Sequence, residues 1–130
     1  MNENTITTKL IKVLNTIPNC YARKQHGGMF SSGDPDINAC IDGHSLKIEV
    51  KVSGGELSAL QAEQMEKWSG ANSIVMLAIW DYADKSFTVY SSAQDWRQLV
   101  GKCKNIPNLR KACVVHTSVP CDAKSFSNIL

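Results

Sequence analysis

The hydrophobic pattern predicts a chain in which helices and strands are interleaved. Helical spacing of apolar residues predicts helices over residues 5–15 and 57–68, and Ser92 is placed to cap a third that ends near Val100. Apolar or alternating runs predict strands over residues 20–25, 36–41, 46–52, 73–79, 87–90 and 112–116. The run 73–79 is almost entirely apolar, as in a strand buried on both faces. The pattern therefore predicts an α/β protein with a mixed central β-sheet flanked by α-helices.

The predicted strand at residues 46–52 alternates strictly between apolar and charged side chains. Its apolar side consists of Leu46, Ile48, Val50 and Val52, and its charged side of Lys47, Glu49 and Lys51. One face of this strand should belong to the core, which leaves the other available for chemistry.

A hairpin turn at Asp42-Gly43 predicts how this strand pairs with the preceding one. In that register, residues whose numbers sum to 85 face each other, so Asp36 faces Glu49 with Cβ atoms roughly 5 Å apart. Like charges in this position are destabilising unless they are compensated. Mg²⁺ and Mn²⁺ prefer oxygen ligands, so Asp36, Glu49 and the backbone carbonyl of Val50 form a candidate metal site.

Lys51 lies two residues beyond Glu49 on the same predicted face. Its ammonium group is placed to orient or help deprotonate a hydrolytic water, or to offset charge that develops on a phosphate. The alternative is an exposed hairpin face with a surface Glu–Lys pair, which is common and contributes little.

These residues match a known signature, and more of the chain agrees with it. Pro35-Asp36 and Glu49-Val50-Lys51 match the PD-(D/E)xK nuclease motif. With the segments Gly33–Ile37, Ile48–Lys51 and Gly55–Ser58 and with Gln61, the chain resembles the virus-type replication-repair nuclease (VRR-NUC) branch of that superfamily. The resemblance covers about residues 33–70 and is absent after about residue 90. It implies a restriction-endonuclease-like core and metal-dependent phosphodiester hydrolysis.

The resemblance also implies roles for two further residues. An acidic residue on the first helix often completes the metal shell in this superfamily, which suggests Glu3 as a ligand. Glu3 is equally explained by the helix dipole, which favours an acid in a first turn. Gln61 is expected to face the site and hold the attacking water or Lys51, although Ser58 and Gln61 also form a possible capping box.

The net charge of +2 is too small to indicate nucleic-acid binding, but the charge is unevenly distributed. From Arg97 onward, six Lys and Arg residues stand against one acid, Asp122, which gives six minus one, or +5. These basic residues can follow DNA phosphates, or they can form an ordinary solvated face. The candidate DNA contacts are Arg23, Lys24, His26, Lys102 and Lys104.

A chain of 130 residues with 43% hydrophobic content is expected to form one domain over residues 1–130. No apolar run approaches the roughly 20 residues of a membrane span, and the polar start is no signal peptide, so we expect a soluble, cytoplasmic protein. Five cysteines without CxxC spacing predict reduced thiols. A zinc site would require the irregularly spaced set Cys103, Cys113, His116 and Cys121.

Together these features predict a structure-specific endonuclease that uses Mg²⁺ or Mn²⁺ and acts on DNA. The chain leaves little room for a base-reading module, which favours branched DNA and a Holliday-junction-resolvase-like activity. The alternatives are a flap or end nuclease or nickase in replication and repair, and a non-catalytic nucleic-acid-binding module. Cutting a junction needs two active sites, so we expect a homodimer. The hydrophobic residues around Trp80 and Tyr82 or in residues 96–100 are candidates for its seam and equally for the core of the monomer.

Overall fold

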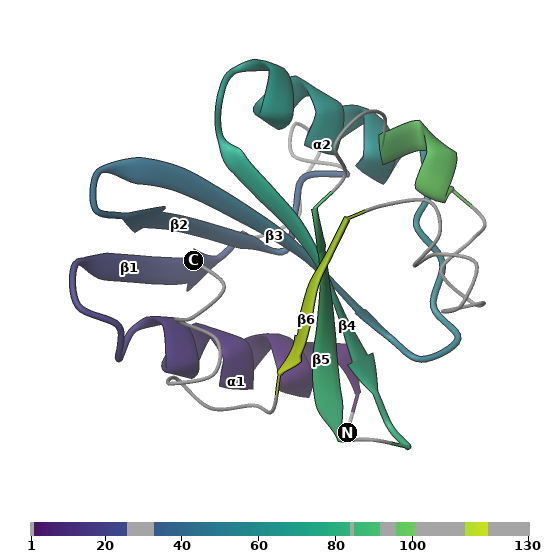
Figure 1. Ribbon diagram of the computed structural model, residues 1–130, viewed down its shortest axis with the longest axis horizontal. Coiled ribbons are helices and arrows are strands. Elements are labelled where there is room, and N and C mark those ends of the chain that lie inside the picture. The colour runs from purple at the N-terminus through teal and green to yellow at the C-terminus, as the bar shows by residue number, and fades with distance from the viewer. Residues whose placement is uncertain (1, 26–32, 84, 92–95, 101–113, 120–130) are drawn as a thin grey trace.

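The computed structural model describes residues 2–25, 33–83, 85–91, 96–100 and 114–119. Three helical segments and six strands follow one another along the chain (Figure 1). They are α1 (Glu3–Leu14), β1 (Cys20–Lys24), β2 (Ile37–Ile41), β3 (His44–Val52), α2 (Ala59–Gly70), β4 (Ile74–Asp81), β5 (Ser86–Ser91), the 3₁₀ helix η1 (Trp96–Leu99) and β6 (Val114–Val119).

The six strands form one sheet in sequence order, β1-β2-β3-β4-β5-β6. All neighbouring pairs are antiparallel except β3 and β4, which run parallel and are joined through α2. A parallel pair requires such a crossover, because its second strand must begin at the same end as the first. The predicted fold class, α/β with a mixed central sheet and flanking helices, is confirmed.

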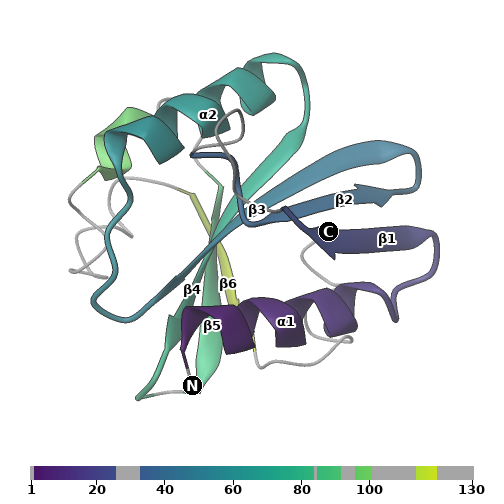
Figure 2. The same cartoon turned by 180° about the vertical axis from the view of Figure 1, so that it is seen from behind.

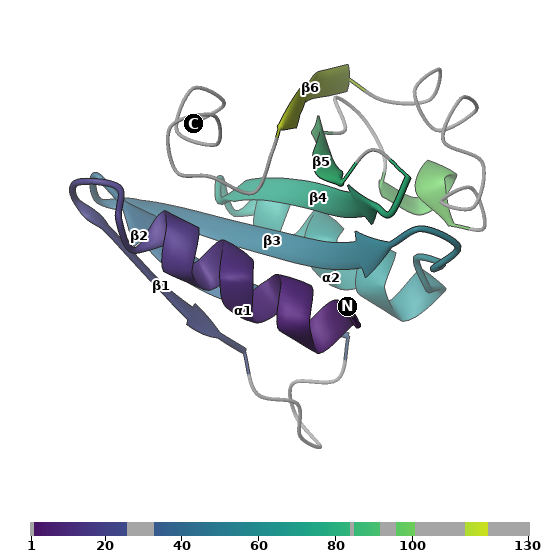
Figure 3. The same ribbon diagram turned by 90° about the horizontal axis from the view of Figure 1, so that it is seen from below.

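The two α-helices pack on opposite faces of the sheet (Figure 3). Beneath α1 lies one apolar cluster, to which the helix contributes Ile6, Leu10 and Leu14 and β3 contributes Leu46, Ile48 and Val50. Beneath α2 and η1 lies a second cluster, which includes Met65, Trp96, and the β4 residues Val75, Leu77 and Ile79. Residues 75–80 are all buried, as predicted for a strand covered on both faces.

The hairpin between β2 and β3 has the predicted turn and register. Asp42 and Gly43 have φ values of 49° and 82°, as a two-residue turn of this hand requires. Ile37 pairs with Ile48, and every further pair also sums to 85. However, β2 begins at Ile37, one residue later than predicted, because the Asp36 carboxylate instead accepts a hydrogen bond from the backbone of β3.

Helix boundaries differ from the predicted ones where caps decide them. Asn2 caps α1 by accepting a hydrogen bond from Thr5 N at 2.9 Å, so the helix begins at Glu3. The predicted third helix is the 3₁₀ segment η1 in the residues that the structure describes, and its proposed cap Ser92 lies outside them. The Trp96 indole N–H donates to Ser69 Oγ at 3.0 Å, so contact with α2 holds this segment in place.

Among the residues considered for a dimer seam, Trp80 and Trp96 belong to the core of the protomer. Trp80 is 5% exposed and packs edge-on against Phe87, with ring centroids 5.1 Å apart. Trp96 is likewise buried, whereas Tyr82 and Val100 remain exposed. Among the helices that the structure describes, none has the length and apolar character needed to cross a membrane.

Candidate active site

The charged face of β3 is buried beneath α2. Glu49 is 0% exposed, Lys47 is 7% exposed and Lys51 is 8% exposed. The sequence predicted that these side chains share a face, but not that a helix covers them. Burying charged groups is costly unless they are paired, so the arrangement demands a compensating partner.

Asp36 lies beside Glu49 at the point where β2 leaves β3. Its carboxylate Oδ2 accepts a hydrogen bond from the Val50 backbone N–H at 2.8 Å. In a strand, the N–H and C=O of one residue point to the same edge, so the Val50 carbonyl faces the Asp36 side of β3. The two carboxyl groups and this carbonyl therefore converge on one edge of the strand.

A close approach between the preceding segment and α2 positions Asp36. Gly33 has a φ of +81°, and a Cβ atom added there would lie 2.6 Å from Leu60 Cγ in α2. Only glycine combines this backbone conformation with such close contact. The segment that leads into Asp36 is thereby held against the helix that covers Glu49.

The carboxyl group of Glu49 is incompletely compensated. Its Oε1 accepts a hydrogen bond from Gln61 Nε2 at 3.2 Å and lies 3.8 Å from Lys51 Nζ. Its Oε2 is buried and finds no donor among the described residues. Burial, followed by the charge of Asp36, raises the pKa of Glu49 to about 10, and Lys51 opposes this shift. Without a cation, the carboxyl group therefore holds its proton, which Asp36 is close enough to share.

Glu3 is the third carboxyl group of this region. It is the first residue of α1, and the N-terminal end of that helix lies beside the arrowhead of β3 in Figure 3. Burial raises the pKa of Glu3, Lys51 lowers it, and Asp36 raises it. Glu3 also adds to the upward shift of the pKa of Glu49. The helix dipole and the nearby Lys51 both favour its ionised form, which burial opposes.

These oxygen atoms fit a divalent cation. Among the described residues, the carboxyl groups of Glu3, Asp36 and Glu49 influence one another and are opposed by the ammonium group of Lys51, so full ionisation leaves an excess of negative charge. Within the described ranges, no three His, Cys, Asp or Glu side chains are close enough to hold a metal by themselves. A cation here would therefore depend on Asp36 and Glu49 together with the Val50 carbonyl, and Mg²⁺ usually keeps water among its remaining ligands.

Gln61 forms the predicted capping box and also faces the site, where its amide contacts Glu49 rather than the predicted Lys51. Its side-chain Oε1 accepts from Ser58 N at 3.0 Å, and its backbone N–H donates to Ser58 Oγ at 3.1 Å, which completes a capping box. Its Nε2 donates to Glu49. The start of α2 and the buried carboxyl group are therefore held by one side chain.

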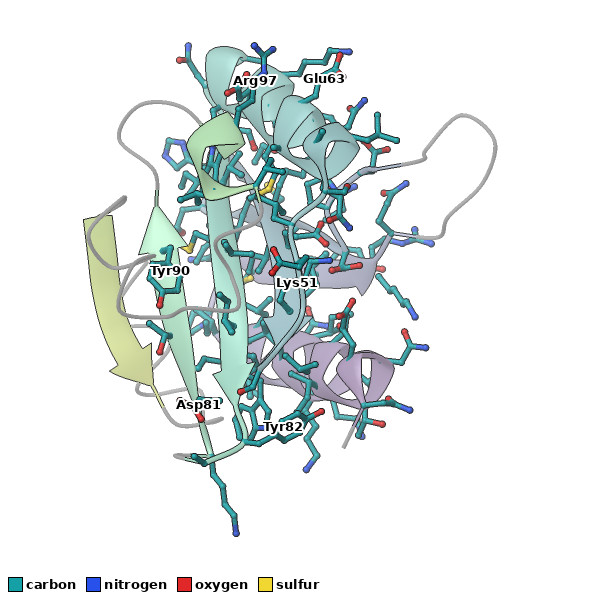
Figure 4. The ribbon with its side chains drawn as sticks, turned by 90° about the vertical axis from the view of Figure 1, so that its right-hand side faces the viewer. Lys51, Glu63, Asp81, Tyr82, Tyr90 and Arg97 are labelled. Atoms are coloured by element: carbon teal, nitrogen blue, oxygen red, sulfur yellow. The ribbon has the colours of Figure 1, made fainter. Side chains whose placement is uncertain are left out.

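Lys51 completes the group on the side of the molecule shown in Figure 4, where it lies between α2 and α1. Its ammonium group is close to Glu49 but not in tight hydrogen-bond contact with it. Buried on the strand that carries Glu49, the group is held near the carboxylates without being fully engaged by them.

Of the five predicted DNA contacts, the structure describes Arg23 and Lys24, which lie on opposite faces of the sheet. Arg23 is exposed on the sheet face that turns away from α1. Lys24 points to the other side and donates to Asn4 Oδ1 in α1 at 2.9 Å. His26, Lys102 and Lys104 lie outside the described residues, as do Cys103, Cys113 and Cys121 of the possible zinc site. The side chain of His116, the fourth candidate zinc ligand, is not described either.

Lys47 is a charged residue of this face for which the sequence suggested no role. Its ammonium group donates to Asn38 Oδ1 at 2.5 Å and lies 4.0 Å from the ring centroid of Trp68. Burial lowers the pKa of Lys47, while the charge of Asp34 raises it. The strict alternation of β3 was the signal that placed Lys47 on the face of Glu49 and Lys51.

Comparison with known proteins finds a likeness to solved structures. No protein-family profile matches the chain, and no curated protein sequence matches it. Its structure is similar to that of Hjc, a Holliday junction resolvase from the archaeal hyperthermophile Archaeoglobus fulgidus. The match has a TM-score of 0.48 and 24% sequence identity, and it covers 67% of this chain and 71% of that chain.

Proposed function

We propose that this protein is an endonuclease that hydrolyses phosphodiester bonds in DNA with the help of Mg²⁺ or Mn²⁺. The observation that carries the proposal is the environment of Glu49, a fully buried carboxyl group beside Asp36, with one oxygen atom that finds no donor among the described residues. A buried acid pair of this kind is stabilised most simply by a cation.

In this proposal, Asp36, Glu49 and the Val50 carbonyl hold the ion, and the carboxylate of Glu3 on α1 adds negative charge nearby and can reach the ion through a water molecule. When bound, a divalent cation lowers the pKa of water and offsets negative charge on a phosphate. The Val50 N–H fixes the orientation of Asp36, which leaves the other carboxylate oxygen of Asp36 for the ion. The Gln61 amide likewise orients Glu49. It donates only to Oε1, which leaves Oε2 of Glu49 for the ion.

Lys51 and Gln61 act on the water and the phosphate. The Lys51 ammonium group is held close to the carboxylates, where it can donate to the attacking water or to a phosphate oxygen whose charge grows in the transition state. The Gln61 amide is anchored by Ser58 and can orient the same water without losing its place on α2. Both groups are positioned in advance, which is what electrostatic catalysis requires.

The substrate we propose is branched DNA, with a four-way junction as the first choice. A chain of this size that carries a single carboxylate site is suited to recognising phosphates and shape. Resolving a junction requires two cuts, and a two-fold dimer would present two such sites with the symmetry of the junction. The seam would then use surface other than Trp80 and Trp96, which are buried in the protomer.

The test is a cleavage assay with purified protein on junction, flap, continuous duplex and single-stranded DNA, with Mg²⁺, Mn²⁺ or chelator. We expect paired cuts in mobile four-way junctions that require the ion and are lost in Asp36→Asn and Glu49→Gln. Glu63→Gln is the matched control, since Glu63 is an exposed acid on α2 outside the site.

Other outcomes of the cleavage assay would change the proposed function. Cleavage restricted to flaps or ends would replace the junction with a flap or end substrate and retain the metal site. DNA binding without cleavage under either ion would refute the catalytic proposal and indicate a binding module. Full activity in Glu49→Gln would show that the chemistry lies elsewhere in the chain.

A further inference from the structure

A second surface lies on the same face of the sheet as the carboxylates, beyond the region that α2 covers. Ala22 is buried in the cluster beneath α1, so its neighbours Tyr21 and Arg23 point to the opposite face. On β2, Ile37 and Ala39 belong to the same cluster, which places Asn38 and Cys40 beside Tyr21 and Arg23. Figure 1 shows β1 and β2 extending away from α2. We name the surface of Tyr21, Arg23, Asn38 and Cys40 the β1–β2 shelf.

The shelf continues directly into the carboxylate site. Arg23 pairs with Asn38 across β1 and β2, and Asn38 pairs with Lys47 across β2 and β3. Lys47 precedes Glu49 by two residues on the same face of β3, a separation of about 7 Å along the strand. Tyr21 pairs with Cys40, and Cys40 pairs with Ser45, so Tyr21 lies roughly 13 Å along the strands from Glu49 and two strand spacings of about 4.8 Å across. A nucleic-acid strand whose phosphate lies at Glu49 would therefore reach Tyr21 with a nucleotide a few positions away.

The shape of the shelf suits a planar ring. Tyr21 is 67% exposed, an unusually large exposure for an aromatic residue within a strand. Tyr21 and Arg23 line an open hollow of about 160 Å³, together with Asn38, Ala39 and Cys40. Aromatic rings beside a guanidinium group are the elements with which proteins bind unpaired bases and the phosphates that link them.

The charge of the shelf is complementary to that of a nucleic-acid strand. Arg23 is exposed, whereas Lys47 is 7% exposed and is held by Asn38 Oδ1 and the Trp68 ring. Asp34 is the acid whose charge acts on Lys47. Arg23 can therefore contact a phosphate directly, and the buried charge of Lys47 adds to the positive potential between the shelf and the carboxylate site.

We propose that the β1–β2 shelf binds an unpaired nucleotide a few positions from the scissile phosphate. Tyr21 stacks on the base, while Arg23 faces a neighbouring phosphate group. This inference rests on the proposed function, because the carboxylate site sets the path of the strand. It predicts that the enzyme prefers DNA with a base unstacked at the branch point over continuous duplex, whatever the overall geometry of the branch.

The experiment measures binding separately from cleavage. Fluorescence anisotropy in chelator compares a blunt duplex with the same duplex carrying a short single-stranded extension. Loss of one base–aromatic stack should weaken binding of the extended duplex by about tenfold in Tyr21→Ala, because such a stack contributes roughly 1–3 kcal/mol. Binding of the blunt duplex should not change. Tyr21→Phe should bind like the wild type, because stacking depends on the aromatic ring and not on the hydroxyl group.

Two further readouts identify the contact itself. A 2-aminopurine placed at successive positions of the extension should be quenched at one position by the wild type and not by Tyr21→Ala. Arg23→Ala should reduce the salt dependence of binding by about one phosphate contact. Circular dichroism confirms folding, which an exposed position should tolerate.

The outcomes separate this inference from the proposed function. If the wild type cleaves branched DNA but Tyr21→Ala binds the extended duplex as tightly as the wild type, the proposed role of the shelf is refuted and the nuclease proposal is retained. If no substrate is cleaved but tight binding of the extended duplex still requires Tyr21, the nuclease proposal is refuted and binding of an unpaired nucleotide by the shelf is retained. An equal loss for blunt and extended duplexes would make Tyr21 a general backbone contact and would refute base stacking.

Discussion

Gln61 donates its side-chain amide to Glu49 Oε1 at 3.2 Å, and so links the start of a helix to a buried carboxyl group on a neighbouring strand. The same side chain closes the capping box of α2 through its other amide atom. A residue with both roles affects stability and chemistry together, and variants are needed that change one role at a time.

Gln61→Glu and Ser58→Ala are such variants. Glutamate is a good capping-box partner, so Gln61→Glu should keep the start of α2, but it removes the amide donor to Glu49 and adds negative charge. Loss of a group that supports a ligand typically costs 10- to 100-fold in activity, and we expect a rate reduction of about that size. Ser58→Ala should cost about 1 kcal/mol of unfolding free energy with a nearly unchanged rate. Denaturant unfolding and single-turnover cleavage measure the two effects, and equal rate losses in both variants would contradict the separation.

Binding of a divalent cation should stabilise the folded protein through Asp36 and Glu49. At a concentration one hundred times the Kd, a ligand specific for the folded state adds about 2.7 kcal/mol, which is a readily measured shift in Tm. We expect Mg²⁺ or Mn²⁺ to raise the Tm of the wild type and of Glu63→Gln, but not that of Glu49→Gln or Asp36→Asn. A Tm shift of normal size in Glu49→Gln would remove Glu49 from the ligand set.

The stability of the metal-free protein should fall as the pH rises. The pKa of Glu49 is raised from its ordinary value of 4.5 to about 10, mainly by burial and by Asp36. Below pH 4.5 the carboxyl group is protonated in both states, whereas between these values the unfolded chain has released a proton that the folded protein still holds. The contribution of this group to stability is therefore fully present below the pKa that Glu49 has in the unfolded chain. It is lost as the pH rises toward the pKa in the folded protein, with a slope of at most about 1.4 kcal/mol per pH unit.

Denaturant unfolding across this pH range, in chelator, measures the effect. Glu49→Gln should flatten the slope, leaving a smaller contribution in the same direction from Glu3, whose pKa is also raised. Added Mg²⁺ should reduce the slope in the wild type, because the ion stabilises the carboxylate. A wild-type slope that Glu49→Gln does not change would contradict the assignment of the buried proton to Glu49.

Lys51 should act in the chemical step. Its buried ammonium group faces the carboxylates, where transition-state charge would develop, rather than the solvent. We expect Lys51→Ala to lose about 100-fold or more in single-turnover rate, the loss typical of removing one stabilising donor, with DNA affinity nearly unchanged. Lys67→Ala, which removes an exposed lysine of α2, is the control. A loss confined to affinity would make Lys51 a phosphate contact only.

The protein should form a homodimer, at least on a four-way junction. Sedimentation at micromolar concentration with and without the junction measures this directly. Of the positions considered for the seam, Tyr82 and Val100 keep exposed side chains, so Val100→Asp should weaken the association if residues 96–100 form it. A monomer that still makes paired cuts would refute the dimer, and a monomer that only nicks would favour a flap nuclease or nickase.

The sequence by itself determined the features that depend on near neighbours. Alternation in residues 46–52 assigned Glu49 and Lys51 to one face of a strand, because side chains in a strand alternate whatever packs on them. The Asp42-Gly43 turn determined the register of β2 against β3, because few residues adopt positive φ at both turn positions. The capping box likewise predicted where α2 begins, to within two residues.

Only the tertiary structure decided which of these side chains are buried and which contact one another. The burial of Glu49 depends on α2 crossing back over β3, and the Asp36–Val50 bond depends on how the chain enters β2; neither has a local signal. In the sequence, the capping role and the site-facing role of Gln61 were alternatives, because either one explains a glutamine at this position. They coexist because an amide has a donor end and an acceptor end, and the packing of α2 on the sheet directs the donor end toward Glu49.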